Sequence, residues 1–259
     1  NTADFGGRLH DCHVNADDSL WIVPAATGHI QRWSAVGELL AQIGESDRFD
    51  SSDRSRDGEP LNSDSAQFFL PASIDVDESA GEIYVADGEL PGGNARIAVF
   101  DADGRFKRQW RLHREANDDR IELPHCLRIS NDGLIYVCDR RADQIQVFNK
   151  QGQLQQIIYA PHTPISDPTG RTSGVRGDTV VLEFSTDANQ QYLYVVNQNS
   201  MTVEVLDRRT GEWITRFGGG PGRYPGQFEL PHGIAVDTDG NVYVAEQEGR
   251  RVQKFLLRE

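Results

Sequence analysis

The chain has 259 residues, and its 40 acidic and 26 basic side chains give a formal net charge of -14 at pH 7. Proteins that bind DNA or RNA neutralise phosphates with Lys and Arg, so this balance argues against a nucleic-acid partner. No apolar run in the sequence approaches the roughly 20 residues that cross a bilayer. We expect a soluble monomer without a membrane partner, folded as a single domain over residues 1–259.

The cysteines are few and irregularly spaced. Cys12, Cys126 and Cys138 show no CxxC pattern, and they suit neither a disulfide framework nor a thiolate zinc site. The first residues carry no secretory signal, but a mature secreted chain would have lost one. From these residues alone, the compartment stays open.

A short alternating segment recurs five times, at residues 20–23, 83–87, 135–139, 193–197 and 242–246. Each copy follows another alternating stretch and a tight turn, a pattern typical of a β-hairpin. A third strand is expected after each hairpin, and a fourth closes the first four repeats. The last repeat ends without a fourth strand.

Four-stranded repeats without helical periodicity predict an all-β fold of the β-propeller type. The repeats cover approximately residues 9–45, 68–112, 121–160, 174–219 and 228–257. Two segments fall outside this rhythm, residues 45–65 and residues 161–176. We expect both to be surface loops, the first of them solvated and mobile because it is rich in Ser, Asp and Arg.

Histidine recurs at one position of the repeat, at the start of the first strand. This position holds His10, His125 and His232 in repeats one, three and five, and Ala72 and Val180 in the other two. The innermost strands of a propeller line its central channel, so three such imidazoles could meet and leave a fourth coordination position open, as in a catalytic zinc site. The alternative is that histidine merely belongs to the repeat consensus.

The symmetry of such a site depends on the number of blades. In a six-bladed ring, repeats one, three and five lie about 120° apart, whereas in a five-bladed ring the first and fifth are neighbours. We therefore expect a six-bladed architecture, although only five repeats are visible. Either a further blade precedes Asn1, or the ring has five blades.

Arg140 directly follows the second strand of the third repeat. The second strand of a hairpin runs back beside the first, so Arg140 should emerge on the same face as His125. A guanidinium beside a metal pocket is suited to binding a carboxylate through two parallel hydrogen bonds. The alternative is a salt bridge to Asp139 or Asp143.

Three segments carry a family resemblance: Phe228–Asp237 (FELPHGIAVD), Val242–Glu246 (VYVAE) and Arg251–Phe255 (RVQKF). They resemble the NHL repeat family, and the resemblance covers most of the chain. The order of the repeats is similar to that in the lyase domain of peptide-amidating enzymes, the peptidyl-α-hydroxyglycine α-amidating lyases. The second repeat, with Val85–Gly88, and the third, with Cys138–Arg140, resemble the lyase repeats at the same points.

The resemblance implies a six-bladed propeller whose zinc is held by His10, His125 and His232, with Arg140 as the carboxylate anchor. It implies cleavage of the C–N bond of a peptidyl-α-hydroxyglycine-like substrate, which releases a peptide amide and glyoxylate. We expect a secreted protein, extracellular or periplasmic, while a cytoplasmic location stays open.

Three features depart from the family pattern. The family has a tyrosine, proposed as a catalytic base, directly after the Asp-Gly of the second repeat, where this chain has Glu89. Glu89 could be a base of different pKa. The acid that contacts a structural calcium after the third histidine is replaced by Gly233, and the family's first blade has no counterpart.

These observations predict a zinc-dependent, lyase-like enzyme for a small-molecule or peptide substrate that bears a carboxylate, with Arg140 as anchor and Glu89 as base. The alternative is a non-catalytic NHL propeller that serves as a scaffold for protein or peptide binding. A third class, the metal-dependent lactonases, fits less well because those sites rely on Glu, Asn and Asp ligands.

Overall fold

The computed structural model describes residues 8–118, 120–163 and 178–257. Of helices and strands, only β-strands are present in these ranges. The same ranges contain no helix that is long and apolar enough to cross a membrane. The strands group into two compact units, Asn1–Ile129 and Ser130–Glu259.

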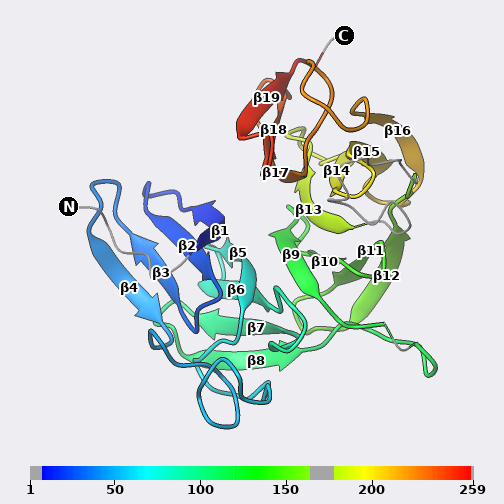
Figure 1. Cartoon of the computed structure of the whole chain (residues 1–259). Helices are drawn as coiled ribbons and strands as arrows, with labels where there is room; N and C mark the ends of the chain where they lie inside the picture. The colour runs from blue at the N-terminus through cyan, green and yellow to red at the C-terminus, as the bar shows by residue number, and fades with distance from the viewer. Residues whose placement is uncertain (1–7, 119, 164–177, 258–259) are drawn as a thin grey trace. The chain divides into compact units, whose positions relative to one another are not determined.

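The first unit contains two complete four-stranded sheets (Figure 1). One sheet has the order β1 (Arg8–Val14), β2 (Leu20–Ala25), β3 (Ile30–Trp33) and β4 (Leu39–Ile43). The other has the order β5 (Pro71–Asp77), β6 (Glu82–Asp87), β7 (Arg96–Asp101) and β8 (Phe106–Trp110). The last strand of this unit is β9 (Pro124–Ile129).

The second unit continues the same pattern. Strands β10 (Ile135–Asp139), β11 (Gln144–Phe148) and β12 (Leu154–Tyr159) belong to a sheet of order β12-β11-β10-β9. Next come β13 (Thr179–Phe184), β14 (Tyr192–Asn197), β15 (Thr202–Asp207) and β16 (Trp213–Phe217). The last sheet has three strands, β17 (Pro231–Val236), β18 (Val242–Glu246) and β19 (Arg251–Phe255).

The predicted fold is confirmed. The described residues form five propeller blades of antiparallel strands, four with four strands and the last with three, as the repeats predict. A sixth blade is not among the described residues. The expected loop at residues 161–176 lies outside them from residue 164 onward.

Apolar side chains of successive blades pack together within each unit. In the first unit, Trp21 and Val23 of the first blade join Ile74, Val85 and Phe100 of the second in one buried cluster. The second unit has an equivalent cluster between its last two blades. Each such side chain, when fully buried, contributes roughly 1.5–3 kcal/mol, so the face-to-face packing of neighbouring sheets supplies the stability of each unit.

In four of the five blades, the repeat position that carries histidine lies at a β-bulge. Leu9 pairs with Pro24 and Asp11 pairs with Val23, so His10 is an extra residue in β1. The register shifts in the same way around Ala72, Val180 and His232. A bulge turns a side chain away from the regular pleat. The position therefore has a structural role even where its residue is Ala or Val.

Residues 45–65 differ from the solvated loop that the composition predicts. Asp50 and Ser51 are buried, and Ser51 forms an isolated β-bridge with Pro60. The Asp50 carboxylate accepts hydrogen bonds from Asn94 Nδ2 at 2.9 Å and from the Ser63 amide at 2.8 Å, and it lies 3.5 Å from Arg96 Nη2. These contacts attach the segment to the second blade.

We predict that Asp50→Ala lowers the free energy of unfolding by about 2–3 kcal/mol, because it removes the acceptor of Asn94 Nδ2 and of the Ser63 amide and one buried ion-pair partner of Arg96. Chemical denaturation followed by circular dichroism measures this change. The matched control is Glu59→Ala, an exposed acid of the same segment. Equal stability of the two variants would show that the segment is an independent surface loop.

Candidate functional site

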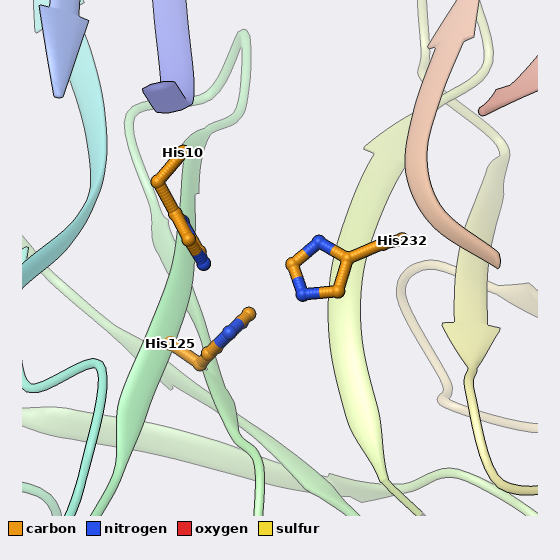
Figure 2. Close-up of side chains that lie close together, drawn as sticks. All are labelled: His10, His125 and His232. Atoms are coloured by element: carbon orange, nitrogen blue, oxygen red, sulfur yellow. The ribbon is translucent and has the colours of Figure 1, made fainter. Parts of the chain in front are cut away.

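Two of the three predicted histidines meet within the first unit. The ring centroids of His10 and His125 are 4.8 Å apart, and their planes meet at 75° (Figure 2). Their side chains are only 5% and 1% exposed. The bulge in β1 and the start of β9 thus place two imidazoles together in a site that water hardly reaches.

A backbone carbonyl orients His10. Its Nδ1 lies 2.7 Å from the carbonyl oxygen of Ala72, the residue at the bulge of the next blade. A carbonyl oxygen only accepts hydrogen bonds, so Nδ1 carries a proton, and in the neutral imidazole Nε2 offers its lone pair. Histidine ligands of metals are commonly oriented by such a contact on the other ring nitrogen.

Glu89 lies between the two rings. Its Oε2 is 3.0 Å from Nε2 of His10 and 3.0 Å from Nε2 of His125. The other carboxylate oxygen accepts a hydrogen bond from Arg8 at 3.1 Å, and the Glu89 amide donates to the Leu70 carbonyl at 2.8 Å. The candidate base of the sequence analysis therefore touches both candidate ligands.

A glycine makes this approach possible. A Cβ on Gly88 would lie only 2.7 Å from Cδ of Pro124, the residue before His125. Any larger residue at this position would push the segment after β6 away from β9. The Asp87-Gly88-Glu89 sequence thus combines a close backbone contact with a buried acid.

The environment of Glu89 acts on its pKa in two directions. Burial alone raises the pKa of Glu89, but the neighbouring imidazoles of His10 and His125 outweigh burial and hold this pKa well below the usual range.

Arg140 forms a bidentate ion pair within the second unit. Its Nε lies 2.8 Å from Oδ1 of Asp178 and its Nη2 lies 3.0 Å from Oδ2. Both side chains are largely buried. Two parallel hydrogen bonds to a carboxylate are the geometry expected of an anchor, and a carboxylate of this chain is bound there.

His232 lies at the bulge of β17 in the second unit and is half-buried. Its convergence on His10 and His125 stays a prediction from the repeat. The structure thus places His10, His125 and Glu89 together in the first unit and pairs Arg140 with Asp178 in the second.

Two charged partners in these contacts, Arg8 and Asp178, were not predicted from the sequence. Both stand two residues before the bulge position, in the first and fourth repeats. The other three repeats have leucine there: Leu70, Leu123 and Leu230. A charged residue at a position that is otherwise apolar is a signal that an alignment of the repeats could have found.

The interpretation of the cysteines was wrong. Cys126 in β9 and Cys138 in β10 are both disulfide-bonded, whereas Cys12 is free and exposed. Disulfides persist mainly in oxidising compartments.

Comparison with known proteins extends this picture. Residues 123–148 and 228–255 match the NHL repeat family. Peptidyl-glycine alpha-amidating monooxygenase B of Xenopus laevis is 29% identical over 95% of this chain and 26% of its own length. A probable peptidyl-alpha-hydroxyglycine alpha-amidating lyase of Caenorhabditis elegans is 29% identical over 98% of this chain and 66% of its own. NHL repeat-containing protein 3 of Homo sapiens is 27% identical over 93% of this chain and 63% of its own length.

The chain spans about a quarter of the length of the amidating monooxygenases and less than two thirds of the other relatives. Among solved structures, a catalytically inactive virginiamycin B lyase from Staphylococcus aureus with quinupristin aligns with a TM-score of 0.60 at 14% identity, over 100% of this chain and 73% of that one. The Cps50 β-propeller domain of Myceliophteria thermophila also aligns with a TM-score of 0.60 at 14% identity, over 97% of this chain and 65% of that one. These likenesses show the propeller fold alone. Two segments of the chain thus match the NHL repeat, and most of the chain is similar in sequence to peptidyl-α-hydroxyglycine α-amidating lyases and to NHL repeat-containing proteins.

Proposed function

We propose that this protein is a zinc-dependent lyase for a small substrate of the peptidyl-α-hydroxyglycine type, and that it acts as a monomer. The observation that carries the proposal is the buried pair of imidazoles, whose Nε2 atoms both lie 3.0 Å from one carboxylate oxygen. Zinc favours such nitrogen and oxygen donors. The sequence relation to amidating lyases supports the substrate class.

The proposed reaction cleaves a carbinolamide. The hydroxyl proton leaves, its electron pair forms the C=O of glyoxylate, the C–N bond breaks, and the amide nitrogen takes up a proton. When bound, zinc supplies Lewis-acid polarisation of the carbinol oxygen. His10, oriented by the Ala72 carbonyl, and His125 would hold the ion together with His232.

Arg140 would hold the substrate carboxylate in the manner in which it binds Asp178. Two parallel hydrogen bonds define both the position and the plane of the carboxylate, which orients the carbinol carbon. Substrate binding would then require that Asp178 give up these bonds. The largely buried pair limits competition from water.

The disulfide-bonded Cys126 and Cys138 support an extracellular or periplasmic location. We propose this compartment as the place of action.

A second candidate function is non-catalytic binding of a protein or peptide. Two observations favour it: Glu89 contacts both histidines, and Asp178 binds Arg140. If these carboxylates remain bound to the two imidazoles and to the Arg140 guanidinium, a substrate does not bind to these side chains.

We predict about one equivalent of zinc per chain in the purified protein, and its loss in His125→Ala, because that variant removes a buried ligand. Elemental analysis by mass spectrometry measures the content. His113→Ala, at an exposed histidine, is the matched control and should keep its zinc. A wild-type protein that neither contains nor binds zinc would contradict the metal-dependent function.

We also predict that Arg140→Ala raises KM for an N-acyl-α-hydroxyglycine at least tenfold, about 1.4 kcal/mol of lost binding. Release of glyoxylate gives the rate. The neighbouring exposed Arg141→Ala is the control and should leave KM unchanged. An equal KM in wild type and Arg140→Ala would rule out the anchoring role.

A further inference from the structure

We infer that Glu89 is itself a metal ligand, so that two histidines and one carboxylate of the first unit bind the ion beside the proposed ligand His232. This inference rests on the proposed metal site. It differs from the three-histidine site and from the role of Glu89 as a base. The ligand class is a divalent transition metal, with zinc as the first candidate.

The distances support direct coordination. Neighbouring ligand atoms in a tetrahedral zinc site are about 3.3 Å apart, since each lies about 2.0–2.1 Å from the ion. Glu89 Oε2 is 3.0 Å from Nε2 of His10 and from Nε2 of His125. Both separations are thus close to the spacing of neighbouring ligand atoms around a zinc ion.

The chemistry of the three atoms points the same way. A carboxylate oxygen and an imidazole lone pair repel each other unless a proton or a metal ion lies between them. At His10 the carbonyl of Ala72 already orients Nδ1 as the donor, so Nε2 is the atom that offers its lone pair. One metal ion between Oε2 and the two Nε2 atoms satisfies all three together.

The surroundings of Glu89 are those of an oriented ligand. Arg8 binds the Oε1 atom at 3.1 Å, which leaves Oε2 directed to the histidines. The Glu89 side chain is only 4% exposed, and its amide is held by the Leu70 carbonyl. Partners of this kind hold ligating carboxylates in place and add to metal affinity.

A ligand set from one unit has a consequence for His232. Since His10, His125 and Glu89 lie within the first unit, metal binding should persist without His232. The carboxylate also adds a negative charge to the site, which strengthens binding of a divalent cation. His232 then changes the coordination of the ion but is not required to retain it.

The test uses the full chain stripped with a chelator and titrated with zinc by calorimetry. We expect Glu89→Gln to raise the Kd at least tenfold, and His232→Ala to raise it less than Glu89→Gln does. Glu59→Gln, at an exposed acid, is the control and should bind as wild type does. Cobalt absorption spectra of wild type and Glu89→Gln should differ, because one ligand changes.

The inference is overturned if Glu89→Gln binds zinc with the wild-type Kd and gives the wild-type cobalt spectrum. A wild-type chain that binds no metal would instead overturn the proposed function itself. Infrared difference spectra between the zinc-free and the zinc-loaded wild type provide a test that requires no substitution. We expect zinc to shift the stretching bands of a carboxylate, and unchanged bands would refute coordination by Glu89.

Discussion

An extra residue at the start of the innermost strand determines where the candidate site lies. In each of four strand pairs the register slips by one residue, around His10, Ala72, Val180 and His232. The bulge turns these side chains out of the pleat. Ala72 and Val180 occupy the same position in two other blades, so the bulge itself does not require histidine.

Carboxylates of this chain contact the histidine and arginine side chains that the proposed function uses. Glu89 reaches the two imidazoles of the first unit, and Asp178 binds Arg140 in the second. Both contacts are buried, where an ionic group needs a partner. The same geometry that holds the resting protein together is the geometry that would accept a cation at one place and a carboxylate at the other.

The strands were predictable because their signals are local. Alternating residues and turn glycines mark the hairpins, and even the three-stranded last blade follows from the repeat. Residues 45–65 were not predictable in this way. Asp50 looked like one more surface acid, and its burial depends on Asn94, which is 44 residues away in the chain.

The all-β repeat, the order of strands in each blade and the shared position of the histidines follow from the amino-acid pattern alone. Which charged side chains meet depends on how the blades pack. Arg8 and Glu89 are 81 residues apart in the chain, and Arg140 and Asp178 are 38 apart. Ion pairs and metal ligands depend on distances of a few ångströms between such residues. No periodicity in the chain encodes those distances, and the packing of neighbouring blades sets them.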